Sequence, residues 1–222
     1  PEPGEEPESE NVPFQDFLEY TAGFTLGGPI IKDKLFFFAL YETVEETITR
    51  DPGDFYPVQE ELDRILFMID EVYQFDPGSL EDPGDQNRKD DKYLVKLDYN
   101  ISDRHRMTAR YQLTEGSDPR YPGYAGDAQI AFSSHFYTEQ FELSDYNVEL
   151  FSNWSSTFQT EFLAAFKRFK KYRETPQPPL PAIEIDSVDG VEGDPGSISL
   201  GTHVRSQLND LQVDTTVLRF KA

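Results

Sequence analysis

Long runs of alternating apolar and polar residues constrain the fold of this chain more than any other feature. In the first run, residues 20–31, the even positions are mostly apolar, and the odd positions from Thr21 to Gly27 are small or polar. The apolar set is Tyr20, Phe24, Leu26 and Ile30. A period of two is that of a β-strand, whose successive side chains point to opposite faces of a sheet. The run therefore predicts a strand with one apolar face.

The other runs form pairs around short turns. The polar turn Lys32–Lys34 joins the first run to the aromatic segment 35–41, which predicts a hairpin. Runs at 93–100 and 107–114, and then at 136–151 and 157–172, predict two more hairpins, and a seventh run covers 206–221. The alternation changes phase between Leu143 and Tyr146, which predicts a β-bulge there.

The links between hairpins are long and hold most of the proline and glycine. They cover residues 46–91, 116–135 and 174–204. Asp-Pro-Gly occurs four times in them, and each is predicted to form a type II turn with glycine third; the turns begin at Asp51, Asp76, Asp82 and Asp194. The first link also predicts a helix, packed on the rim of the sheet or filling a partner's groove, with an apolar stripe formed by Leu62, Ile65, Leu66, Ile69, Val72 and Tyr73.

Short turns that alternate with long loops, joined by one-sided strands, are typical of outer-membrane β-barrels. The runs of 12 to 16 residues also exceed the usual strand of about five or six. A soluble β-sandwich with long loops is the alternative, because its strands alternate too. The fold class predicted is all-β: a partial antiparallel transmembrane β-barrel of about seven strands, with long extracellular loops, one containing a short helix.

Composition excludes several other classes. The chain has 20 basic and 42 acidic residues, a formal net charge of -22, which makes nucleic acid an unsuitable partner. The absence of cysteine excludes disulfides and thiolate metal sites. No apolar stretch reaches the roughly 18 residues of a membrane helix, and we expect no signal peptide within this chain. Aromatic residues make up 14% of the chain, too many for a disordered acidic tail.

No pattern of catalytic residues is present. The histidines, His105, His135 and His203, stand in no metal or triad motif, and His105 is expected beside a turn. Neighbouring carboxylates such as Glu45–Glu46, Glu60–Glu61 and Asp90–Asp91 are expected by chance in so acidic a chain. We predict that the protein is not an enzyme and assign no catalytic, cofactor-binding or metal-binding residue, with Ca²⁺ in the acidic loops as an alternative to plain turns.

The alternation of side chains along each strand predicts which polar residues face the barrel lumen. They share the face opposite the apolar positions, where they hydrate the interior or contact a plug. The set is Thr21, Thr25, Lys96, Asp98, Arg106, Thr108, Arg110, Gln112, Gln159, Glu161 and Lys167.

The segment Gly27–Phe38 is more specific than any periodicity. With the following Tyr41–Glu42, its GGPIIKDKLFFF resembles the opening barrel hairpin of Oar-type TonB-dependent outer-membrane receptors. Three further segments are similar to that family: residues 91–106, the loop end Tyr73–Gly78 and the turn Asn153–Ser155.

The resemblance implies energised transport through a plugged barrel of about 22 strands in the outer membrane. Receptors of this family are several times longer, so we expect this chain to be a fragment. Residues 1–19 would be an acidic linker leading from a plug that this chain does not contain, and residues 20–222 the N-terminal part of the barrel. The expected partners are the outer-membrane lipid bilayer, the plug, the remaining barrel strands and the TonB complex. The alternative function is a surface adhesion or scaffold protein whose acidic loops bind partners or cations.

Overall fold

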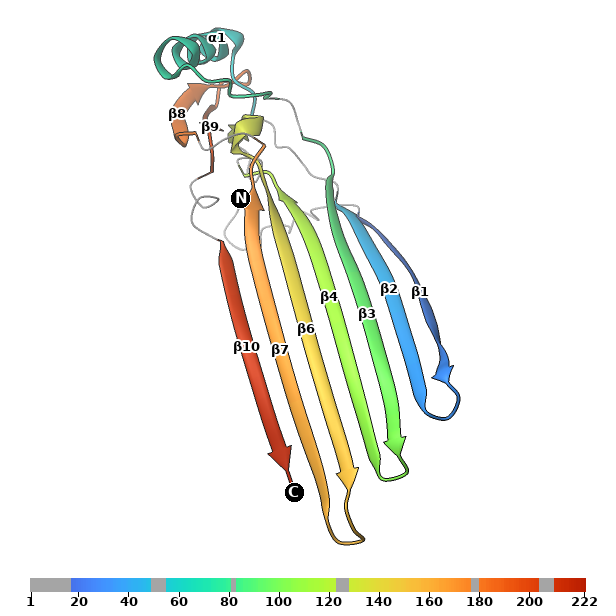
Figure 1. Ribbon diagram of the computed structural model, residues 1–222. Helices are drawn as coiled ribbons and strands as arrows, with labels where there is room; N and C mark the ends of the chain where they lie inside the picture. The colour runs from blue at the N-terminus through green and yellow to red at the C-terminus, as the bar shows by residue number, and fades with distance from the viewer. Residues whose placement is uncertain (1–16, 49–54, 81–82, 123–127, 177–179, 204–209) are drawn as a thin grey trace, which may run out of the picture.

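A computed structural model describes residues 17–48, 55–80, 83–122, 128–176, 180–203 and 210–222 (Figure 1). These residues form one long antiparallel sheet with a small cap at one end. None of the described helices is long and apolar enough to cross a membrane.

The main sheet has seven strands, and the predicted all-β, mostly antiparallel class is confirmed. Their order is β1-β2-β3-β4-β6-β7-β10, so each predicted hairpin is a pair of neighbours. Most strands are longer than the alternation indicated, and the seventh begins later. Their bounds are β1 (Phe17–Ile31), β2 (Leu35–Ile48), β3 (Gln86–Ser102), β4 (His105–Arg120), β6 (Tyr137–Asn153), β7 (Gln159–Glu174) and β10 (Leu211–Lys221). Because β1 begins at Phe17, residues 17–19 belong to this strand and not to a linker.

The sheet is open at both edges. Within the described residues, β1 pairs only with β2, and β10 pairs only with β7. Among the described elements, no helix or second sheet covers either face along its length (Figure 1).

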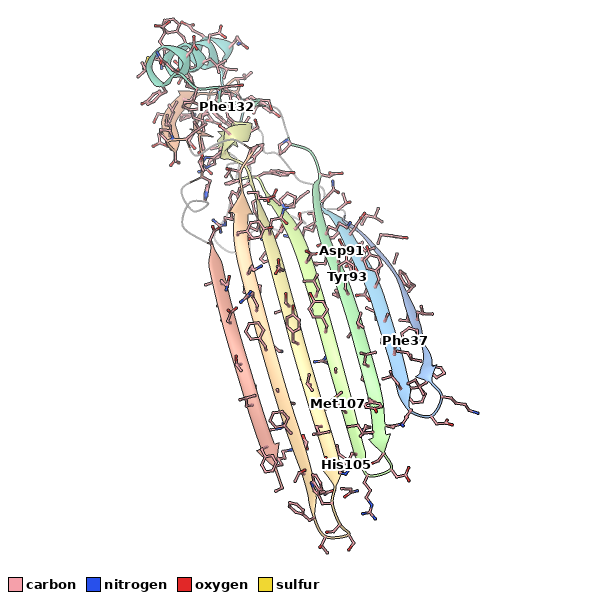
Figure 2. All side chains as sticks on the ribbon, in the orientation of Figure 1. Phe37, Asp91, Tyr93, His105, Met107 and Phe132 are labelled. Carbon is pink, nitrogen blue, oxygen red and sulfur yellow. The ribbon has the colours of Figure 1, made fainter. Side chains whose placement is uncertain are left out.

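Cross-strand register divides the sheet into two different faces. On one face, which we call the aromatic face, Tyr41 stands between Phe24 and Tyr93. From here to the short turns the side chains of this face are mostly apolar, among them Phe37, Tyr93 and Met107, which Figure 2 labels. This apolar band consists of Phe24, Leu26, Leu35, Phe37, Ala39, Tyr41, Tyr93, Val95, Leu97, Tyr99, Met107, Ala109, Tyr111, Leu113, Tyr146, Val148, Leu150, Phe162, Ala164, Phe166, Leu218 and Phe220. The opposite side is the polar face.

The β-bulge predicted between Leu143 and Tyr146 is absent. β6 keeps an unbroken register with both β4 and β7 through this segment. Instead, the apolar side chains change faces: Tyr146 ends the apolar band, and Leu143 lies on the polar face. The phase change marks the border of the apolar band, because Ser144 and Glu142 occupy the aromatic face beyond it.

The three long links converge into a cap that the sequence did not predict. It contains a second sheet, in the order β5 (Gln129–Ala131), β9 (Pro195–Leu200) and β8 (Ile183–Asp189), where only loops were expected. Its core unites all three links, and every fully buried large apolar side chain of the described residues lies in it. That core is Phe55, Ile65, Ile69, Ile130, Ala131, Phe132, Val188, Ile198 and Leu200.

The predicted helix is α1 (Gln59–Met68), which continues as a π-helix at Ile69–Tyr73. Ile65 and Ile69 of the predicted stripe are buried in the cap, so the helix packs on strands from the other links and not on the rim of the main sheet. Leu66, Val72 and Tyr73 are exposed, so only part of the predicted stripe faces the core.

The Asp-Pro-Gly turns divide into two kinds. Gly78 and Gly84 have φ angles of 80° and 73°, as the third position of a type II turn requires. The prediction at Asp194 is wrong: Pro195 and Gly196 belong to β9, where Gly196 lies against the ring of Phe55 and leaves no room for a Cβ. Asp51 and Asp82 lie outside the described residues.

Candidate functional site on the polar face

The polar face gathers all eleven residues that parity assigned to a lumen. The register aligns Thr25 with Leu40, and through β3 and β4 it continues to Gln112 and Lys167. The same alignment joins Lys96 to Arg110, and Gln159 to Asn153. All eleven residues therefore lie on the same face of the sheet, as predicted.

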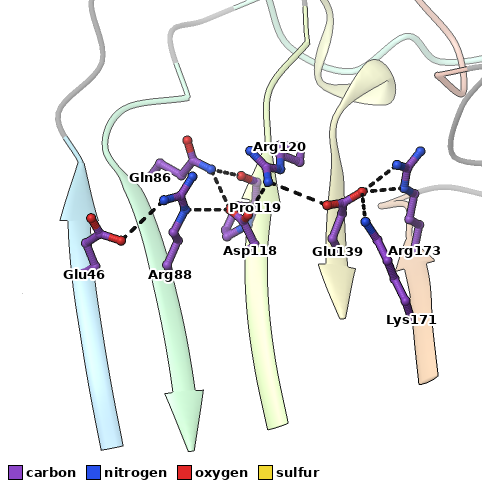
Figure 3. A network of polar contacts seen from close by, with 9 residues as sticks. All are labelled: Glu46, Gln86, Arg88, Asp118, Pro119, Arg120, Glu139, Lys171 and Arg173. Atoms are coloured by element: carbon purple, nitrogen blue, oxygen red, sulfur yellow. Dashed lines mark hydrogen bonds and ion pairs between the residues drawn. The ribbon is translucent and has the colours of Figure 1, made fainter. Parts of the chain in front are cut away.

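A network of charged side chains crosses the polar face where the sheet meets the cap (Figure 3). Arg88 lies 2.9 Å from Asp118 and 3.4 Å from Glu46. Arg120 joins Asp118 to Glu139, to which it lies at 3.7 Å. The network therefore ties five neighbouring strands, β2 to β7 in the main sheet, together at one level.

Glu139 is the centre of this network. Its side chain is buried, and its carboxylate lies 3.0 Å from Nζ of Lys171 and accepts a 2.8 Å hydrogen bond from Nε of Arg173. Burial opposes ionisation, but the hydrogen bonds from Lys171 and Arg173 outweigh it and hold the pKa of Glu139 below its usual range. Glu139 is therefore ionised at neutral pH and neutralises part of a cationic cluster.

The cations around Glu139 also contact aromatic rings. Arg173 lies 4.7 Å from the ring centroid of Tyr137, and Lys171 lies 5.2 Å from that of Phe141. The network counts four cations, Arg88, Arg120, Lys171 and Arg173, against the carboxylates of Glu46, Asp118 and Glu139, which leaves a net charge of +1. In a chain of net charge -22 this is a local reversal of sign.

Ion pairs continue along the polar face toward the short turns. Lys92 lies 2.8 Å from Glu42, and Lys167 lies 3.2 Å from Asp145. At the far end Arg219 lies 2.6 Å from Glu161. A face lined this way can bind water and polar or charged solutes along its length.

The neighbouring carboxylates do not act as pairs. Glu45 lies on the aromatic face with Lys89, whereas Glu46 lies on the polar face with Arg88. Asp90 and Asp91 are separated in the same way, because adjacent residues of a strand point to opposite sides.

The histidines occupy two places. His105 begins β4 beside a turn, as predicted, and its ring lies 4.9 Å from that of Trp154. His135 and His203 come from different links and meet at the base of the cap, with ring centroids 4.8 Å apart. Sequence reasoning missed this contact because no local signal joins the two links.

His135 is held as part of the cap's interior. Its Nδ1 lies 3.0 Å from the carbonyl oxygen of Gly201, and its side chain is buried. Burial lowers the pKa of His135, although the backbone contact with Gly201 acts in the opposite direction. The ring is therefore neutral at pH 7.

Within the described part of the chain, no group of three or more His, Asp or Glu side chains is placed to hold a metal ion. Comparison with protein-family models, with curated proteins and with solved structures found no match to this chain. The two faces of the sheet and the cap above it are therefore the basis for a functional assignment.

Proposed function

We propose that this chain is part of the β-barrel of an outer-membrane receptor of the TonB-dependent, Oar-like type, which takes up or exports a solute through a plugged lumen. The observation that carries the proposal is the uncovered apolar band. Val95, Val148 and Phe220 are 48%, 40% and 66% exposed, although they belong to one continuous apolar surface. Exposure of such a surface to water has a free-energy cost of roughly 25 cal/mol per Å², whereas contact with lipid does not carry this cost.

The dimensions of the band suit a bilayer. On β3 the exposed apolar side chains run from Tyr93 to Ile101, nine residues. A tilted strand needs about 9–11 residues to cross the hydrocarbon layer. The charged network of Glu139 and the whole cap lie beyond this span, on the side of the long loops.

The cap-side border of the apolar band also lies closer to the short turns on successive strands from β4 to β10. On β4 the last apolar residue is Leu113, but its partner on β6 is Ser144, and the band there ends one step lower at Tyr146. On β10 it ends lower still, at Leu218, which pairs with Ala164. Barrel strands tilt by about 35–45°, so a level membrane border must cross successive strands at shifted positions.

In the hairpin of β1 and β2, which resembles that of the receptor family, packing explains the glycine at position 27. Gly27 pairs with Phe38 on the polar face, and a Cβ on Gly27 would lie 3.3 Å from that ring. A larger residue at position 27 would push the Phe38 ring aside by a few tenths of an ångström, so Gly27 suits the close approach of the phenylalanine run. This supports the likeness to the receptor family.

In this proposal the short turns face the periplasm, and the cap lies outside the cell. β1 starts at the cap end, because Phe17 pairs with Ile48. The chain therefore enters β1 from the loop side of the barrel in this proposal.

The test is uptake by cells that express the complete gene, with and without a functional TonB complex. Loss of uptake of a polar solute when TonB is removed supports the proposal. Uptake that is independent of TonB contradicts it.

A second candidate function, surface adhesion, has its own observation. The cap has an independent core, and its helix exposes Phe67, Met68 and Val72 at 65%, 52% and 61%. In that case cells would bind a surface partner through the cap, and deleting TonB would leave the binding unchanged.

A further inference from the structure

A group of cations at the short turns has no carboxylate partner. Of the 18 lysines and arginines in the described ranges, 14 form an ion pair with an aspartate or glutamate. Among the residues that the structure describes, those that form none are Lys32, Lys34, Arg104 and Arg106. All four are exposed. In a chain with 42 acidic residues, cations that no carboxylate neutralises are free to bind an anion from outside the chain.

These four cations line one open cleft of about 610 Å³. They come from the turn between β1 and β2 and from the turn that leads into β4. Asp33 and Asp103 also line the cleft, so four cations face two carboxylates and the net charge is +2. Two backbone hydrogen bonds of 2.8 Å, one from β3 to the first turn and one from the end of β6 to the second, hold the neighbouring turns together.

The strands contribute mainly polar-face residues to the cleft. Arg106 pairs with Asn100 on β3 and with Phe151 on β6, and all three line the cleft. Met107, the next residue of β4, belongs to the apolar band on the opposite side of the sheet. The cleft is therefore the short-turn end of the polar face, away from the apolar band.

Both ends of the polar face are thus positive. The network around Glu139 at the cap end carries a net charge of +1, and the cleft carries +2. Between these ends, cations such as Lys92 and Lys167 are paired with carboxylates. A path lined in this way attracts anions at each end and disfavours the entry of cations.

We propose that the cleft binds a small anionic solute, one that carries a phosphate group or several carboxylates, at the short-turn mouth of the lumen. This inference rests on the proposed function, which makes the polar face the wall of the transport path, and it names the class of solute. Lysine and arginine bind phosphate and carboxylate through charge-assisted hydrogen bonds. The volume of about 610 Å³ is that of a small-molecule site, which favours a solute over an acidic protein segment.

The test is equilibrium dialysis of the protein, purified in neutral detergent from cells that express its complete gene. The probes are inorganic pyrophosphate and citrate, with sucrose as the neutral solute. We expect at least one of the two anions to bind at least about tenfold tighter than sucrose, and more weakly as salt is added. The variant Lys32→Gln/Lys34→Gln/Arg104→Gln should weaken this binding at least about tenfold. Lys32→Arg/Lys34→Arg, which keeps the charge, should retain it.

A matched control removes the same charge at the other end of the molecule. Arg64→Gln/Lys89→Gln/Lys92→Gln should change anion binding less than about twofold, because these residues lie far from the short turns.

Three results would overturn the inference. The first is binding of both anions no tighter than that of sucrose. The second is an equal loss of binding in the glutamine variant and in the control, which would show only an effect of total charge. The third is tighter binding of tetraglutamate than of pyrophosphate and citrate, which would assign the cleft to an acidic protein segment. Dialysis needs neither TonB nor a bilayer, so these results refute this inference alone, whereas TonB-independent uptake refutes the proposed function and leaves the anion site in place.

Discussion

The Nε atom of Arg173 donates a 2.8 Å hydrogen bond to Oε1 of Glu139, joining β7 to β6 where the main sheet meets the cap. Glu139 also lies within ion-pair distance of Lys171 and Arg120, so one buried carboxylate contacts three cations. This arrangement makes Glu139 the least replaceable charge of the polar face.

The variant Glu139→Gln should loosen this end of the sheet by roughly 2 kcal/mol, less than the loss of a fully buried pair because Lys171 and Arg120 keep contact with solvent. Hydrogen exchange of residues 137–143 should become faster. Glu149→Gln is the matched control, because Glu149 lies exposed on the same face of the same strand. Equal effects of the two substitutions would show that the network has no special role.

The cap should unfold without the main sheet. Phe132 is 2% exposed at the centre of the cap core, and Phe132→Ala should cost the cap about 3–5 kcal/mol. Limited proteolysis should then cut the segment 55–80, while the sheet stays protected. Phe67→Ala, at a side chain 65% exposed on α1, should leave the cleavage pattern of the wild type.

The cap should weaken in mild acid. The pKa of His135 is lowered by burial from its ordinary 6.5, so below that pH the unfolded cap binds a proton that the folded cap resists. Its contribution to stability is complete above pH 6.5 and declines as the pH falls toward the folded pKa. The protection factors for hydrogen exchange of residues 128–136, which correct for the intrinsic effect of pH on exchange, should fall as the pH drops below 6.5.

His135→Gln should flatten this dependence, since the amide can still donate to Gly201 but does not titrate. His105→Gln, at the far end of the sheet, should leave it as in the wild type. A cap whose exchange is equally pH-dependent in all three proteins would mean that His135 is not its acid-sensitive group.

The strands could be predicted from sequence only where the two faces differ. Tyr93–Tyr99 alternates strictly, and its hairpin was predicted correctly. The upper halves of β2 and β3 were missed, because Glu45, Glu46, Asp90 and Asp91 place charges on both faces once the apolar band has ended. Alternation of apolar and polar residues arises where the two faces of a sheet meet different surroundings, and it disappears where both faces are polar.

The cap could not be predicted because its core is shared among distant segments. β5 has three residues, too few for a periodic signal, and it pairs in parallel with β9 from another link. The Glu139–Arg173 pair was missed for the same reason: the residues are 34 positions apart and meet only through the register of β6 and β7.

A charge on the aromatic face should be far more harmful than one on the polar face. Val148→Arg places a cation in the middle of the band and should cost about 2–4 kcal/mol in a bilayer. Asn147→Arg, at the preceding residue, points to the polar face and should cost little. Urea titration of the protein in lipid vesicles measures both, and equal costs would argue against lipid contact.

The central claim is that the aromatic face contacts lipid, and single labels along β3 test it most directly. The chain contains no cysteine, so cysteines at positions 93–99 can be labelled one at a time with a fluorophore in the membrane-embedded protein. We predict that lipid-borne nitroxide quenches the labels at Tyr93, Val95, Leu97 and Tyr99, and that aqueous iodide quenches those at Leu94, Lys96 and Asp98. Quenching by iodide at every position, without alternation, would contradict the account.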